Sequence, residues 1–195
     1  MSMRGMTLVE AMVVVGITAA VSASLLSMIR YFYINNAYVV EATTAVENSR
    51  RGLATSLGYL REASYGDDGS YPVASAATSS VTFYSDTDSD GAIEKVKIWA
   101  YQNTLYTVVT NSTGNPPSYT SGSTATTSIV SYLRNATSTP IFKYYDSNGT
   151  QLSSTSTPVS SIATLTMTVQ IDLNPNRAPQ IFTLFGSATL RNLRD

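Results

Sequence analysis

The feature that most constrains this chain is a long uncharged run near its start. No Asp, Glu, Lys or Arg occurs between Glu10 and Arg30, and most of residues 11–29 are apolar. A helix rises about 1.5 Å per residue, so this run spans roughly 28 Å, close to the hydrocarbon thickness of a bilayer. We therefore expect residues 6–30 to form a membrane-spanning helix with one acid, Glu10, at its edge.

The carboxylate of Glu10 is the second constraint. An unpaired charge in lipid costs a few kcal/mol, so an ionisable residue at this position is a functional candidate. The first cation that follows it along the helix is Arg30, roughly 30 Å away. We therefore expect Glu10 to take a cationic partner from outside its own helix.

The residues around Glu10 resemble the class III signal of type IV pilins and the related pseudopilins. That signal is a short basic leader ending in Arg-Gly or Lys-Gly, followed by an aromatic residue or Met and then Thr-Leu-Val-Glu. This chain has Arg4-Gly5-Met6 and then residues 7–10 in that same order. The resemblance implies that residues 1–5 are a leader, that a prepilin peptidase cuts between Gly5 and Met6, and that Met6 becomes an N-methylated terminus. It also implies that Glu10 meets the terminal amine of a neighbouring subunit during assembly.

The resemblance further implies a function and a location. A member of this family is a structural subunit of a type IV pilus or a type II secretion pseudopilus. Its precursor is a single-pass protein of the inner membrane with an extracytoplasmic head, and it later enters a filament in the periplasm or at the cell surface. Its partners are other pilin or pseudopilin subunits, the prepilin peptidase, the inner-membrane assembly platform and the membrane. The long head without cysteine most resembles a minor subunit, such as the J-type pseudopilin or the W-type minor pilin.

Two other interpretations of the first thirty residues stay open. A secretory signal could be cut near Ala23-Ser24, but it leaves Arg4-Gly5 unexplained. A plain anchor, carrying an extracellular binding module or adhesin, accepts the same apolar run but gives Glu10 no role. We rank the pilin-like signal first, the anchor second and the secretory signal third.

Composition argues against several classes of function. The net charge is −1, so the chain has no overall electrostatic attraction to nucleic acid, and we expect it to bind none directly. Cysteine and histidine are both absent, which removes thiol nucleophiles, thiolate metal sites and the usual general base. We therefore expect a protein that is not an enzyme. The enzymatic alternative, an exported carbohydrate-active enzyme, predicts a cleft with two carboxylates about 5 to 9.5 Å apart.

The helical pattern continues beyond Arg30. Residues 31–65 are expected to form the amphipathic half of one long helix, because apolar residues recur there on one stripe. The alternative is two helices broken near Asn35-Asn36. Gly52 and Gly58 each weaken a helix by up to about 1 kcal/mol relative to Ala, so tertiary packing must hold this part. The stripe consists of Val39, Ala42, Val46, Leu53, Leu57 and Leu60.

Residues 70–195 are expected to form a β-rich globular head, which makes the chain an α+β protein whose long helix packs on an antiparallel sheet. Segments rich in β-branched and aromatic residues predict the strands, and short connections make them antiparallel. Two uncharged segments rich in Ser and Thr, 111–127 and 150–161, are expected to be surface loops. The predicted strands are 81–85, 93–101, 104–110, 129–133, 141–145, 162–173 and 181–190.

One segment of the head suggests a metal site. Asp86, Asp88 and Asp90 alternate before Gly91, with Glu94 close behind, as in the first half of an EF-hand-type calcium loop. These four acids are our candidate ligands for Ca²⁺. The second half of the pattern fails, because Lys97 stands where the bidentate Glu of such a loop would be. The equally weighted alternative is an acidic turn that joins two strands.

Overall fold

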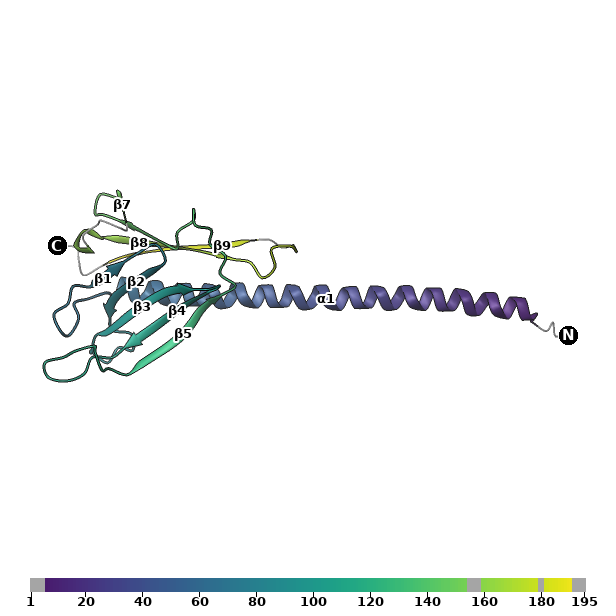
Figure 1. Cartoon of the computed structure of the whole chain (residues 1–195), viewed down its shortest axis with the longest axis horizontal. Coiled ribbons are helices and arrows are strands. Elements are labelled where there is room, and N and C mark those ends of the chain that lie inside the picture. Colours follow the sequence, from purple (N-terminus) through teal and green to yellow (C-terminus); the bar gives the residue numbers. More distant parts are fainter. Residues whose placement is uncertain (1–5, 154–158, 179–180, 191–195) are drawn as a thin grey trace. The chain divides into compact units, whose positions relative to one another are not determined.

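The computed structural model describes residues 6–153, 159–178 and 181–190. Its first element is a single helix, α1, which runs without a break from Leu8 to Arg61 (Figure 1). The continuous helix agrees with the prediction of one long element, and it excludes the alternative break near Asn35-Asn36. The chain divides into two compact units, Met1–Thr44 and Ala45–Asp195.

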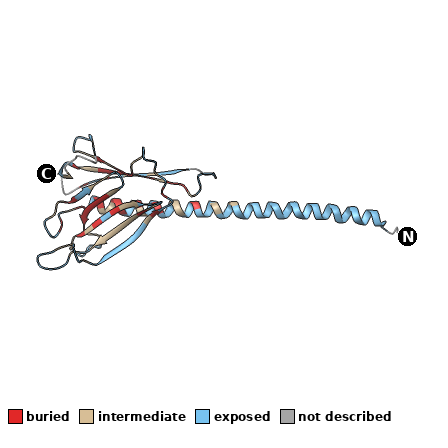
Figure 2. Cartoon of the chain, in the orientation of Figure 1, coloured by how far each residue is buried: buried red, intermediate tan, exposed pale blue. Residues whose placement is uncertain are grey.

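In the first unit, residues 8–34 of α1 are mostly apolar and all exposed. An 18-residue window of the helix has a mean hydropathy of 2.2 and no buried residue, and Figure 2 shows this half of α1 in the colour of exposed residues. Within the uncharged run 11–29, the hydroxyls of Thr18 and Ser27 donate to the carbonyls of Val14 and Ala23 one turn earlier. α1 is therefore long and apolar enough to cross a membrane, with these polar groups satisfied internally.

The second unit is a head, whose described residues form the end of α1 and two antiparallel sheets (Figure 1). One sheet has the strand order β1-β2-β3-β4-β5 and the other has the order β7-β6-β8-β9. A 3₁₀ turn, η1 (Val159–Ser161), follows β7. The strands are β1 (Val73–Ala76), β2 (Ser80–Ser85), β3 (Glu94–Tyr101), β4 (Thr104–Thr110), β5 (Thr124–Ser131), β6 (Phe142–Tyr145), β7 (Gln151–Leu152), β8 (Thr164–Ile171) and β9 (Phe182–Thr189).

The core of the head joins the end of α1 to both sheets. Leu53, Leu57 and Leu60 of the predicted stripe are buried in one cluster with residues of β2, β3, β4, β6 and β8. Alternate residues of β8 point into this cluster, as the period of a strand requires. The last three residues of the apolar stripe on α1 therefore find their partner surface within the head, and the α+β class is confirmed.

Several details differ from the sequence-based expectations. Val39, the first residue of the stripe, is exposed. β1 and β7 were not predicted, and the head has two sheets rather than one. β5 begins at Thr124, inside a segment that was expected to be a loop. The start of this strand was not predicted because its hydroxyl-rich residues are exposed and lack the apolar alternation that marks a half-buried strand.

Candidate functional site

The first turn of α1 is closed by reciprocal hydrogen bonds between Thr7 and Glu10. The Thr7 amide and hydroxyl both donate to Oε2 of Glu10, each at 3.0 Å. The Glu10 amide donates back to the Thr7 hydroxyl at 3.3 Å. Thr7 stands just before the helix and Glu10 is its third residue, so the pair forms a capping box, which satisfies amides that a helix start would otherwise leave unpaired.

The capping box gives Glu10 a role that does not depend on a filament. A plain anchor does have a use for an acid at this position, because the box stabilises the start of any helix. The pattern Thr-x-x-Glu at residues 7–10 is thus a local capping motif as well as part of the predicted signal. Both partners lie after Gly5, so a cut between Gly5 and Met6 would leave the box intact.

The capping box leaves part of the Glu10 carboxylate free. Both bonds from Thr7 end on Oε2, and Oε1 has no hydrogen-bond partner among the described residues. Neither Lys nor Arg occurs between Met6 and Arg30. Met6 is exposed at the start of the described chain, whereas Gly5 and the rest of the predicted leader lie outside the described residues.

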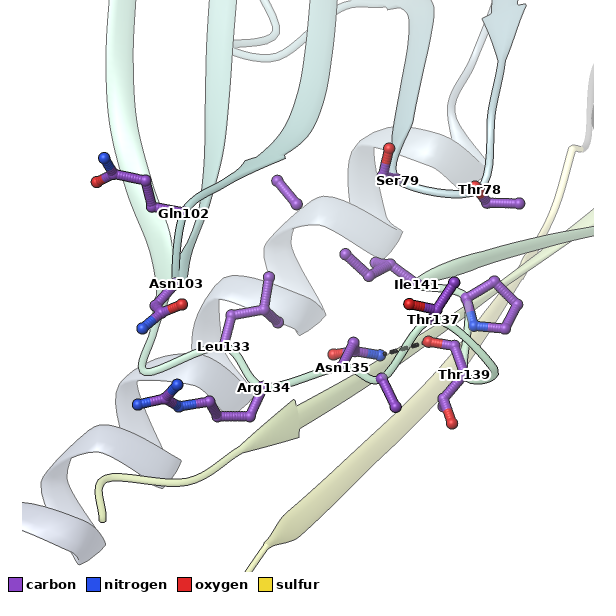
Figure 3. Close-up of a pocket in the computed structure, with 13 residues that line it drawn as sticks. Thr78, Ser79, Gln102, Asn103, Leu133, Arg134, Asn135, Thr137, Thr139 and Ile141 are labelled. Carbon is purple, nitrogen blue, oxygen red and sulfur yellow. Dashed lines mark hydrogen bonds between the residues drawn. The ribbon is translucent and has the colours of Figure 1, made fainter. Parts of the chain in front are cut away.

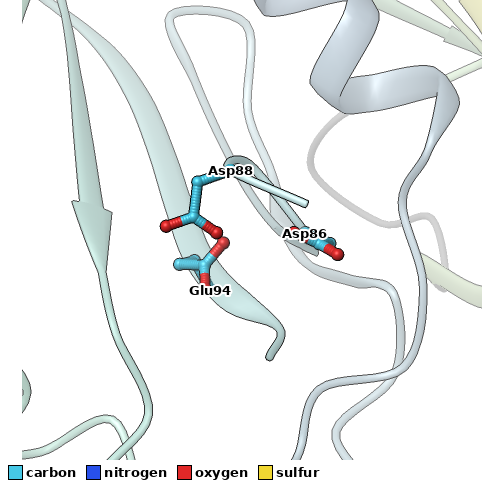
Figure 4. A group of neighbouring side chains, drawn as sticks. All are labelled: Asp86, Asp88 and Glu94. Atoms are coloured by element: carbon cyan, nitrogen blue, oxygen red, sulfur yellow. The ribbon is translucent and has the colours of Figure 1, made fainter. Parts of the chain in front are cut away.

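In the head, three of the four predicted metal ligands come together. Asp86, Asp88 and Glu94 each offer a carboxylate oxygen, and these oxygens lie within 4.8 Å of one another (Figure 4). Glu94 begins β3 and is buried, Asp86 is half-buried, and Asp88 is exposed. Such a set of hard oxygen donors suits Ca²⁺ or another hard divalent cation.

The loop itself uses several of these oxygens. Oε2 of Glu94 accepts the amide of Thr87 at 2.7 Å and its hydroxyl at 3.0 Å. Asp86 accepts two amides of its own loop, at 2.6 and 3.2 Å. Asp90 is not part of the group of three, and its Oδ1 accepts the amide of Ala92 at 2.8 Å. The loop therefore has the hydrogen bonds of an acidic turn and the grouped carboxylates of a cation site at once.

A tyrosine and an aspartate join this loop to two others. The Tyr119 hydroxyl donates to the carbonyl of Ile93 at 2.7 Å and accepts the amide of Asp67 at 3.0 Å. The Asp67 carboxylate accepts the Ile93 amide and the Ser112 hydroxyl. Loss of solvent around the ring raises the pKa of Tyr119 to about 12. These residues are far apart in the chain, and no local sequence pattern predicts their meeting.

A polar hollow of about 470 Å³ lies between the β1–β2 turn, the β3–β4 turn and the segment after β5 (Figure 3). Arg134 is the one charged residue in its lining. The Asn135 side chain donates to the carbonyls of Thr139 and Thr168 and accepts the amide of Gln170, so it holds the wall together. The lining has no carboxylate, so this hollow does not supply the acid pair that glycoside hydrolysis needs.

No model of a known protein family matches the chain. No curated protein matches it either.

Proposed function

We propose that this chain is a pilin-like structural subunit that is cut between Gly5 and Met6 and assembles into a filament through α1. The observation that carries the proposal is the start of the helix. Arg4-Gly5-Met6 leads directly into a capped helix that is long and apolar enough to span a membrane, with the acid of Glu10 in its first turn. The head of two sheets would then be the extracytoplasmic part.

The chemistry of Glu10 supports an assembly contact. Its Oε1 is free among the described residues, while Oε2 holds the helix cap. In a dry filament core an uncompensated carboxylate is costly, and removing one partner of a buried ion pair costs about 3 to 5 kcal/mol. The cut after Gly5 would create a new cation, the amino group of Met6. On an adjacent subunit, that amine would supply the partner that the helix lacks between Met6 and Arg30.

The capping box favours one rival, a membrane-tethered extracellular module whose helix uses Glu10 only as a cap. Glu10→Gln separates the two functions, because Gln also closes a capping box but carries no charge. Thr7→Ala is the matched control, because it removes the cap and keeps the carboxylate, at a cost of about 1 kcal/mol to the helix.

The test is the amount of each variant in filaments sheared from cells, compared with the amount in the membrane fraction. We expect Glu10→Gln to insert and to be cut like the wild type, yet to be excluded from filaments. Thr7→Ala should still enter them. If Glu10→Gln enters filaments as well as the wild type while Thr7→Ala does not, the cap is the function of Glu10 and the assembly contact is refuted.

A further inference from the structure

The described residues of the head form four outer strands, and three of these strands carry features that limit pairing with another chain. An open strand edge presents unpaired amides and carbonyls, so native sheets usually shorten, bend or cover it. β1 has four residues and a bulge in its register with β2, and β7 has two residues. β9 is longer, but the guanidinium of Arg61 donates to the Ser187 carbonyl at 3.0 Å.

The fourth outer strand, β5, has a long open edge. It has eight residues and pairs only with β4 in the described part of the chain. From Thr124 to Ser128 it is exposed on both faces, and Figure 2 shows most of it in the colour of exposed residues. Over these five residues the register with β4 is regular, because the irregularity falls at Ile129. This half of β5 is therefore a regularly paired and accessible edge.

The sequence of β5 adds no protection. No charged residue occurs between Lys97 and Arg134, and β5 contains no proline. Charges, above all Lys, and proline are the residues with which natural edge strands discourage pairing. Threonine, which supplies three of the five residues from 124 to 128, favours the extended conformation that pairing needs.

We propose that β5 is a self-association edge, where a second copy of this chain adds its own β5 in antiparallel register centred on Thr126. A two-fold contact of this kind brings each residue opposite its counterpart across the axis. Thr126 then faces Thr126, and Thr124 faces Ser128, so hydroxyls meet hydroxyls. Such cross-strand pairs contribute about 0.2 to 1 kcal/mol each relative to Ala pairs.

The absence of charge on β5 favours a second copy of this chain as its partner. A charged partner strand would lose hydration on this edge without gaining an opposite charge, whereas a copy of β5 is itself uncharged. Like-charge repulsion, the usual penalty of a symmetric contact, is therefore absent. This inference goes beyond filament assembly through α1 and does not rest on it.

The absence of cysteine makes the contact measurable in the full chain. Thr126→Cys introduces one thiol, and opposed residues of an antiparallel pair have Cα atoms about 4.5 to 5.5 Å apart, within the range of a disulfide. Thr183→Cys is the matched control, because Thr183 is also an exposed threonine on an outer strand, β9. Under mild oxidation in detergent micelles we expect a disulfide-linked dimer from Thr126→Cys and little from Thr183→Cys.

The register gives a second test. Thr124→Cys alone should crosslink weakly, while a mixture of Thr124→Cys and Ser128→Cys chains should form the mixed dimer, because these positions face each other across the axis. Thr126→Lys should lower the dimer fraction measured by light scattering, and Thr183→Lys should not. A protein that stays monomeric would overturn the proposal. So would equal crosslinking at Thr126 and Thr183, which would mean that α1 alone drives the association.

Discussion

Gly52 of α1 lies against the main chain of Ile129 on β5. A Cβ atom on Gly52 would overlap the Ile129 carbonyl oxygen, closer than Cβ atoms approach in proteins, and would stand only 3.0 Å from the Ile129 Cβ. A Cβ on Gly58, six residues further along the same helix, would meet no atom within 4 Å. Two glycines with the same helix propensity therefore have different reasons to be there, and only Gly52 permits a close approach of helix and sheet.

The first prediction compares alanine at these two positions. Gly52→Ala should destabilise the head, because overpacking costs about 1 to 3 kcal/mol and outweighs a gain in helix propensity of up to about 1 kcal/mol. Gly58→Ala should stabilise it by up to about 1 kcal/mol. The measurement is denaturant unfolding followed by the fluorescence of Trp99, the single tryptophan of the chain, which lies in β3. Equal effects of the two substitutions would contradict the close contact with Ile129.

The second prediction concerns stability at high pH. Loss of solvent raises the pKa of Tyr119 to about 12 in the folded head, against about 10 in the unfolded chain. The folded state therefore prefers the neutral phenol, and this contribution is fully present below pH 10 and is lost as the pH rises towards 12. We expect the free energy of unfolding to fall over this interval. Burial also raises the pKa of Tyr144, so part of the fall should remain when Tyr119 is replaced.

Tyr119→Phe isolates the contribution of the three-loop junction. The variant loses the hydroxyl that joins Ile93 to Asp67, which should cost about 1 kcal/mol at neutral pH. It should also show a smaller fall in stability above pH 10 than the wild type. Tyr101→Phe is the control, since Tyr101 is exposed at the end of β3. If the two variants have the same profile, the hydroxyl of Tyr119 does not hold the loops together.

The third prediction concerns calcium. A cation bound by Asp86, Asp88 and Glu94 stabilises the folded head by mass action, so millimolar Ca²⁺ should raise its melting temperature and a chelator should reverse the effect. Asp88→Asn should abolish the shift, because it removes a charge from the group. Asp90→Asn should retain it, because Asp90 lies outside the group. Melting curves that do not respond to calcium would leave the loop as an acidic turn.

Local chemistry in the sequence predicted the helix well. The uncharged run and the stripe at Leu53, Leu57 and Leu60 determine where α1 is exposed and where it is buried. The first half of β5 could not be predicted in this way, because exposed Thr and Ser residues on both faces give no alternation of apolar and polar positions. The pairing of β5 with β4 depends on tertiary structure and not on the local sequence pattern.

The candidate sites also divide into those that local sequence predicts and those that depend on tertiary structure. The grouping of Asp86 with Asp88 follows from their spacing in one loop. The capping box at Thr7 likewise follows from a local sequence motif, Thr-x-x-Glu. The junction of Asp67, Ser112 and Tyr119 depends on three loops folding to one place. The close fit of Gly52 to Ile129 likewise depends on tertiary structure.

The mass of the N-terminal peptide, taken from protein in its native envelope, tests the central claim most directly. We expect a chain that begins at Met6 with a methylated amine, and a precursor that accumulates when Gly5 is replaced by Leu. A mature chain that still begins at Met1 would contradict it.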